Sequence, residues 1–133
     1  MDGDGRVHPH YKEHIEKIIS SLEAAGYSVF CAVKYENWTI SPKRPPADAV
    51  AEDLAEIRKA DLLLAVLHED ASRGVQYEMG YAAGLDKAVI VATEPKDKLA
   101  YFNKGLIDSG VVKRIVYDSP EELATEIKKL IGQ

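Results

Sequence analysis

The stretch that decides the fold joins an apolar run to a polar turn and a helix: Leu62-Leu63-Leu64-Ala65-Val66-Leu67, then Ser72-Arg73-Gly74-Val75-Gln76-Tyr77-Glu78-Met79-Gly80-Tyr81-Ala82. A continuous apolar run of this length is typical of a strand buried on both faces of a sheet. After it, we expect Gly74 to turn the chain into a helix whose first turn carries Glu78. Open α/β sheets bind ligands at the carboxyl ends of their strands, so the turn is a candidate site.

Glu78 has two interpretations at this stage. Free backbone N–H groups at the start of a helix favour anions, so the turn is suited to a phosphate or to keeping Glu78 ionised. The structural alternative is a first-turn glutamate that merely complements the helix dipole. The stretch alone does not decide between them.

Composition and charge limit the classes of protein. The 133 residues suffice for one domain, 1–133, with its own core. A net charge of −5 and a pI near 5.4 argue against a nucleic acid polymer as partner. No apolar run approaches the roughly 20 residues of a membrane span, and no signal peptide is recognisable, so we expect a cytoplasmic protein without a membrane partner. The single cysteine, Cys31, lies in an apolar segment and excludes an internal disulfide.

Strands are predicted to alternate with helices along the chain. The predicted strands are Tyr27–Val33, Leu62–Leu67, Ala88–Thr93 and Lys113–Tyr117. The predicted helices are Tyr11–Ala25, Ala47–Lys59, the segment from the turn to about Gly84, Leu99–Ile107, and a last helix that begins at Ser119. This order predicts the α/β class, with a doubly wound, flavodoxin-like or Rossmann-like parallel sheet and helices on both faces.

Asp53 is a second carboxylate of interest. On its predicted helix, Val50, Leu54 and Ile57 form the buried stripe, and Asp53 stands at the edge of that stripe. Such a carboxylate needs a partner, and a salt bridge to lysine or arginine is the structural alternative to a functional role.

Several motifs are absent or weak. There is no G-x-G-x-x-G after a strand, no P-loop and no G-x-S-x-G elbow, and neither Val33 nor Leu67 supplies the acidic residue of a receiver domain. His8, His10 and His14 straddle a loop and a helix start, which does not predict a metal site. His68 ends a strand near the turn, where a solvated loop histidine is the simpler interpretation.

With these residues placed, the chain resembles the nucleoside 2-deoxyribosyltransferase superfamily, closest in motif to the 2'-deoxynucleoside 5'-monophosphate N-glycosidases. The resemblance extends from about Gly3 to the terminal helix, and its most specific part is Ser72 to Ala82 with Lys87 shortly after. It implies hydrolysis of the N-glycosidic bond of (deoxy)nucleoside 5'-monophosphates through a covalent glycosyl-glutamate intermediate, without a metal or organic cofactor. Transfer of deoxyribose between bases and non-catalytic nucleotide binding are the alternatives.

The resemblance also implies roles for individual residues. Glu78 falls on the nucleophile and Asp53 on the general acid/base, while Tyr77 or Tyr81 would orient Glu78. Gly3, Gly74 and Tyr81 are expected to contact the substrate, and Arg6 and Ser72 to hold its phosphate. A plain helix N-cap is the alternative role for Ser72.

Two further expectations concern assembly and the sheet. The resemblance implies that Asn103 contributes to the site of a neighbouring subunit, and therefore a homodimer or higher oligomer. Members of the family begin with a strand that this sequence lacks, since Met1 to Arg6 matches the loop after it. In the order 2-1-3-4-5 that strand would lie between Tyr27–Val33 and Leu62–Leu67.

Overall fold

The computed structural model describes residues 8–39, 44–68 and 72–131. Contacts divide the chain into two compact units, residues 1–50 with 119–133 and residues 51–118. The expectation of a single domain over 1–133 stays a prediction.

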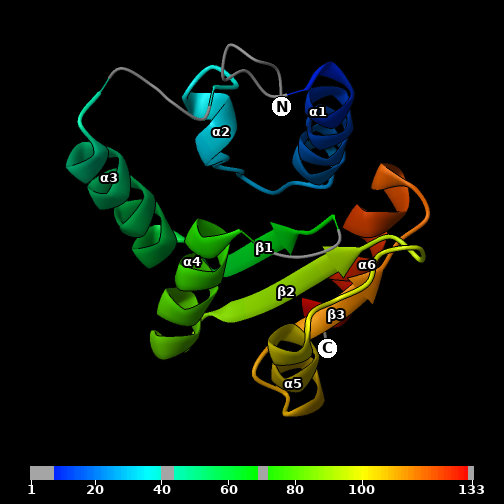
Figure 1. Ribbon diagram of the computed structural model, residues 1–133. Coiled ribbons are helices and arrows are strands. Elements are labelled where there is room, and N and C mark those ends of the chain that lie inside the picture. Colours follow the sequence, from blue (N-terminus) through cyan, green and yellow to red (C-terminus); the bar gives the residue numbers. More distant parts are fainter. Residues whose placement is uncertain (1–7, 40–43, 69–71, 132–133) are drawn as a thin grey trace. The chain divides into compact units, whose positions relative to one another are not determined.

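The second unit is built on a sheet of three parallel strands, β1 (Leu62–Val66), β2 (Ala88–Thr93) and β3 (Lys113–Val116). Figure 1 shows them side by side in the order β1-β2-β3. Helix α4 (Arg73–Gly84) connects β1 to β2, and α5 (Tyr101–Asp108) connects β2 to β3. The parallel sheet and the alternation of strands with helices confirm the predicted α/β class.

One face of this sheet carries the hydrophobic core of the unit. Side chains alternate across a strand, so Leu63 and Ala65 of β1 share a face with Val89 and Val91, their register partners on β2. The same cluster contains residues of three helices and three connections: Leu54 and Ile57 of α3, Val75, Met79, Tyr81, Ala82 and Ala83 of α4, Leu106 and Ile107 of α5, and Leu67, Leu99 and Val112. Helices α3, α4 and α5 are therefore fixed on this face.

Helix α3 (Pro46–Lys59) follows the predicted range within one residue, but its buried stripe is shorter than expected. Ile57 is buried and Leu54 packs against the core, whereas Val50 is 54% exposed. The expectation that Val50 faces inward was wrong. The docked part of α3 is thus its C-terminal part, which also carries Asp53.

The predicted strand Tyr27–Val33 is not formed. Residues 27–31 lie outside regular structure and α2 (Ala32–Tyr35) follows, so Cys31 precedes a helix and is only partly buried. Burial still alternates from Tyr27 to Cys31, as in an extended chain. A strand also needs a neighbour for its backbone hydrogen bonds, and β1 has a strand on only one side within the described residues. Alternation alone therefore predicted the wrong element.

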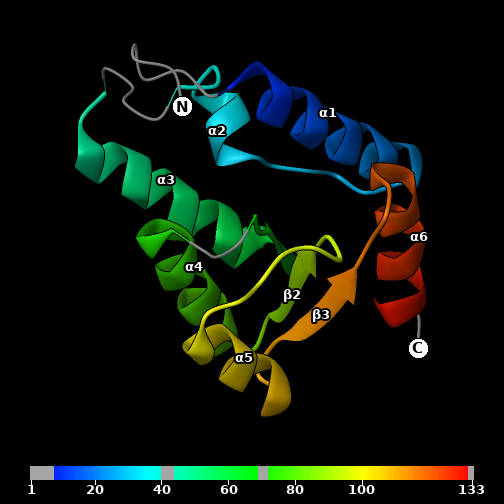
Figure 2. The same ribbon diagram turned by 45° about the vertical axis from the view of Figure 1, so that its right-hand side comes forward.

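In the other unit, α1 (Pro9–Ala24) packs against α6 (Pro120–Ile131), as Figure 2 shows. Both ends of this pair follow their sequence signals. Gly26 ends α1 with a φ of +98°, which glycine adopts without strain. The side chain of Ser119 accepts a hydrogen bond from the backbone N–H of Glu122 at 3.2 Å, which confirms the expected cap of α6.

Leu123 tests the contribution of this helix pair to stability. Its side chain is fully buried in α6, so Leu123→Ala should lower the free energy of unfolding by about 2–5 kcal/mol, measured by urea denaturation. Thr125→Ala, on the exposed side of the same helix, should stay within about 0.5 kcal/mol of the parent. Equal losses in both variants would contradict the packing described for α6.

Candidate active site

The strand, turn and helix predicted around Ser72 are present. β1 ends at Val66, and α4 begins at Arg73 with Ser72 as its N-cap. The Oγ atom of Ser72 accepts a hydrogen bond from the backbone N–H of Val75 at 3.2 Å. The capping role of Ser72 is therefore confirmed. Its hydroxyl proton is not used in this bond, because the oxygen acts as acceptor.

The helix begins earlier than expected, and this changes the environment of Glu78. Gly74 is the second residue of α4 and so does not make the turn. The first turn contains no acidic residue, and Glu78 lies five residues after Arg73, about 7.5 Å along the axis. The field of a helix terminus fades within its first turn, so the expectation that it keeps Glu78 ionised was wrong.

The surroundings of Glu78 favour its protonated form instead. The side chain is half-buried, and the pKa of Glu78 is raised, first by burial and then by the negative charge of Asp53. Burial removes water that would stabilise the carboxylate, and a nearby like charge adds repulsion. Asp53 and Glu78, which were selected separately from the sequence, thus lie close enough for the charge of one to affect the pKa of the other.

Packing explains why Asp53 and Glu78 meet. Leu54 follows Asp53 on α3, Met79 follows Glu78 on α4, and both apolar side chains belong to the core cluster on the sheet. Asp53 is itself partly buried, as expected for the edge of a buried stripe. Residues that were selected separately from the sequence are thus joined by the docking of two helices.

The two tyrosines near Glu78 have different environments. Tyr77 is 65% exposed, and its proposed role in orienting Glu78 stays a prediction. The ring of Tyr81 packs against the core cluster, and its hydroxyl accepts a hydrogen bond from Nη1 of Arg58 at 2.9 Å. Sequence analysis did not select Arg58, although its place in the last turn of the helix that carries Asp53 was available as a signal.

The remaining selected residues lie apart from this pair or outside the description. Asn103 sits in α5 and is only 2% exposed, so its own chain covers the amide that was expected to reach a neighbouring subunit. That role stays a prediction. Gly3 and Arg6 lie outside the described residues.

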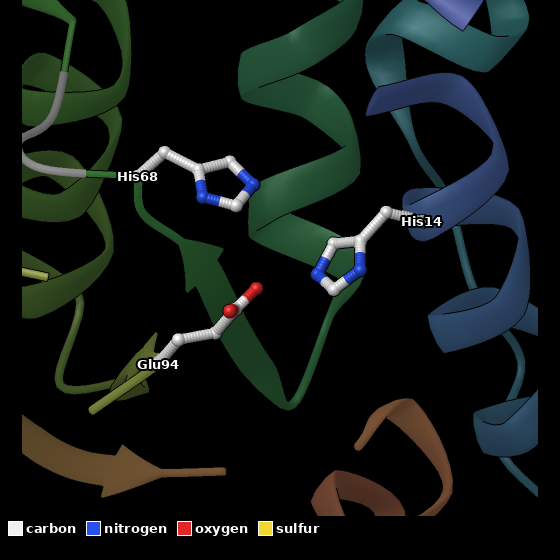
Figure 3. Close-up of side chains that lie close together, drawn as sticks. All are labelled: His14, His68 and Glu94. Carbon is white, nitrogen blue, oxygen red and sulfur yellow. The ribbon is translucent and has the colours of Figure 1, made fainter. Parts of the chain in front are cut away.

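His68 and Glu94 form another polar pair, shown in Figure 3. His68 follows β1 and Glu94 follows β2, and a ring nitrogen and a carboxylate oxygen lie within 4.8 Å of each other. Figure 3 also draws His14, which belongs to the other unit. The carboxyl ends of neighbouring parallel strands meet at one edge, a pattern that could have identified Glu94 from the sequence.

Two partly buried carboxyl groups whose charges interact are an arrangement that glycosidases use to cleave a glycosidic bond. A sequence model of the family described as nucleoside 2-deoxyribosyltransferase matches residues 3–121. The chain therefore belongs to the nucleoside 2-deoxyribosyltransferase family, and it is an enzyme of the N-glycosidase or deoxyribosyltransferase type.

Among solved structures, the chain is similar to Clostridium botulinum CMP N-glycosidase, BcmB, with 25% sequence identity and a TM-score of 0.68. The similarity covers 91% of each chain. A search of curated proteins by sequence found no match. Within the described residues, no helix is long and apolar enough to cross a membrane.

The raised pKa of Glu78 predicts an effect on stability. When the pKa of a carboxyl group is higher in the folded state than in the unfolded state, protonation of the group stabilises the fold. This contribution is complete below the unfolded pKa, near 4.5, and it is lost as pH rises through the folded pKa. Glu78→Gln should therefore unfold at higher urea concentration than the parent at pH 7, with a difference that shrinks towards pH 4.

Asp61→Asn is the matched control, because it neutralises an exposed carboxylate in the same unit. It should not reproduce the pH-dependent gain. If Glu78→Gln is no more stable than the parent at pH 7, the buried-charge description of Glu78 fails.

Proposed function

We propose that this enzyme hydrolyses the N-glycosidic bond of (deoxy)nucleoside 5'-monophosphates through a covalent glycosyl-Glu78 intermediate. The observation that carries the proposal is the pair of partly buried carboxyl groups on α3 and α4, in which the charge of Asp53 helps to raise the pKa of Glu78. Similarity to a CMP N-glycosidase supports a nucleotide substrate, and the family supports chemistry at the same bond.

In the first step, an oxygen of ionised Glu78 forms a bond to the anomeric carbon as the bond from that carbon to the base nitrogen breaks. The base leaves with the bonding electrons and receives a proton from Asp53. Positive charge develops on the sugar in the transition state. A poorly hydrated carboxylate at position 78 stabilises this charge, and the cost of burying it is met before the reaction begins.

The repulsion between the two carboxylates also orders the second step. Repulsion between two close carboxylates is mutual, so the reactive form, with Glu78 ionised and Asp53 protonated, carries a single negative charge at the site. Once Glu78 is a neutral ester, that repulsion is gone. Asp53 can then remain negative and accept a proton from water as the water oxygen attacks the anomeric carbon and releases the Glu78 carboxylate.

Transfer to a second base is the alternative, and the family to which the chain belongs favours it. The same glycosyl-Glu78 intermediate serves both reactions, because only the acceptor differs. Chemistry at Asp53 is also unchanged, since it would then accept a proton from the incoming base.

Release of free base tests this proposal. The purified protein is incubated with nucleosides and with ribo- and deoxyribonucleoside 5'-monophosphates, with and without an acceptor base, and free base is followed by chromatography. Glu78→Ala should lower the rate more than about 1,000-fold because it removes the nucleophile. Asp53→Asn should lower it about 100- to 10,000-fold, the usual contribution of a general acid/base.

Transfer would appear as a new nucleoside or nucleotide formed only when the acceptor base is present. Release of base that persists in Glu78→Ala would remove Glu78 from the mechanism. Binding of a monophosphate without any release by the parent would instead identify a non-catalytic nucleotide-binding protein.

Ser72 allows the phosphate to be tested separately. Its Oγ caps α4, and its unused O–H proton and the first N–H groups of α4 are suited to a phosphate. Ser72→Asp keeps an efficient cap but places a negative charge there. It should raise KM for monophosphates at least about tenfold, a repulsion of roughly 1.4 kcal/mol, and leave KM for nucleosides nearly unchanged.

The control is Ser72→Ala, which loses the cap and should cost about 1 kcal/mol of stability. Its KM for monophosphates should rise less than that of Ser72→Asp. If Ser72→Asp raises KM for both substrate classes equally, Ser72 does not contact the phosphate.

A further inference from the structure

A second pair of side chains joins the two helices that carry Asp53 and Glu78. Nη1 of Arg58 on α3 donates a hydrogen bond to the hydroxyl of Tyr81 on α4 at 2.9 Å. Arg58 lies five residues after Asp53, and Tyr81 three residues after Glu78. At about 1.5 Å per residue, the two pairs are separated by about 7.5 Å along α3 and about 4.5 Å along α4. Both pairs involve the same two helices.

Both ends of the Arg58–Tyr81 link are anchored in the core. The ring of Tyr81 packs against the cluster beneath it, and Ile57, adjacent to Arg58, is buried in that cluster. The bond itself lies at the surface, where a hydrogen bond adds little net stability. Its effect is therefore on geometry, because it defines how the end of α3 lies on α4.

A general helix-end charge does not account for this contact. Arg58 and Lys59 both occupy the last turn of α3, where a cation complements the helix dipole. Lys59 pairs with Glu56 on its own helix at 3.5 Å, whereas Arg58 reaches across to α4. The two neighbours thus have similar charge but different partners.

We propose that Arg58 and Tyr81 are positioning residues whose hydrogen bond fixes the separation of Asp53 and Glu78. The proposal rests on the proposed function, in which these carboxylates are the acid/base and the nucleophile. Two like charges repel; the shared core holds the helices together against that repulsion, and the bond sets the orientation of α3 on α4 in which the two carboxylates lie close. Without it, the carboxylates separate and take up water.

The charged and titratable groups around Glu78 come from few elements. β1 and β2, which pack against α4, have none within their bounds. Those of α4 itself, of α5 and of α3 in this unit are Arg73, Tyr77, Tyr81, Tyr101, Lys104, Asp108, Glu52, Asp53, Glu56, Arg58 and Lys59. Burial comes first and Asp53 second among the causes that raise the pKa of Glu78. Separation and hydration of the carboxylates weaken both causes.

The test is a titration of Glu78 by carbon-13 NMR in protein labelled at the glutamate carboxyl groups, with Glu78→Gln to assign the signal. Tyr81→Phe removes only the hydroxyl, and Arg58→Gln replaces the guanidinium by a neutral amide on a shorter side chain. In each variant, the pKa of Glu78 should fall towards its ordinary value. The double variant should match the single variants, because both remove the same bond.

Lys59→Gln is the matched control, since it removes a positive charge from the same turn without touching Tyr81. It should leave the titration of Glu78 unchanged. An equal fall in Lys59→Gln and Arg58→Gln would overturn the proposal, and a rise in both variants would show that only the lost positive charge acts. An unchanged pKa in Tyr81→Phe, or effects that add in the double variant, would overturn the proposal.

The titration needs no turnover, so it decides the positioning claim even if the protein releases no base. In an active protein, Glu78 must be ionised to attack, and base release rises with pH through its pKa. In Tyr81→Phe, the rise of kcat/KM on the acidic side of its pH profile should then move to lower pH by the same amount as the pKa of Glu78 in the titration. A pKa that moves while the rise of kcat/KM stays at the same pH would refute Glu78 as the nucleophile and leave the positioning claim intact.

Discussion

The docking of the C-terminal part of α3 against α4 is the contact on which the site depends. Leu54 and Ile57 enter the same core as Val75 and Met79, over the face of the sheet that carries Val91. This apolar contact is non-directional and favourable, yet it forces two acidic side chains towards each other at its edge. Hydrophobic packing thereby supplies the free energy that holds a repulsive pair in place.

The partial burial of Glu78 costs folding free energy and, in the proposed reaction, makes the carboxylate a better nucleophile. A carboxylate in water is well solvated and a weak nucleophile, whereas a half-buried one gives up solvation before the substrate arrives. The protein meets this cost in its folding free energy, which is the usual relation between stability and activity at enzyme sites. Asp53 adds to the cost and, in the proposed reaction, also supplies the proton that the departing base needs.

Local patterns predicted elements of both units. The continuous apolar run of Ala88–Thr93 and the cap at Ser119 each correspond to an element of the structure. Tyr27–Val33 failed because a strand depends on hydrogen bonds from a neighbour, which alternation within one segment does not reveal. The prediction that Val50 is buried failed for a similar reason. The helical period identifies one face of α3, but it does not show how far along the helix the core covers that face.

The candidate site was predicted in its residues but not in its electrostatics. Asp53 was selected because it stands at the edge of a buried helical stripe, and Glu78 because it follows the turn after a strand. The family resemblance then implied that both act in the same reaction. Their mutual effect required the distance between two helices, which one sequence does not contain. Because α4 begins at Arg73, Glu78 lies beyond the short range of the helix field, and burial followed by the charge of Asp53 raises its pKa. Arg58 was missed since its partner lies on another helix.

The position of Glu78 inside a regular helix has a consequence for motion. A nucleophile on a loop can advance towards its target, but the backbone of α4 is held by its own hydrogen bonds and by the core beneath Met79. In the proposed reaction, the carboxylate therefore stays nearly still. The sugar must therefore move. Its anomeric carbon moves away from the base towards the fixed oxygen of Glu78 in the first step, and away from that oxygen towards water in the second. The space available for this movement determines which sugars react.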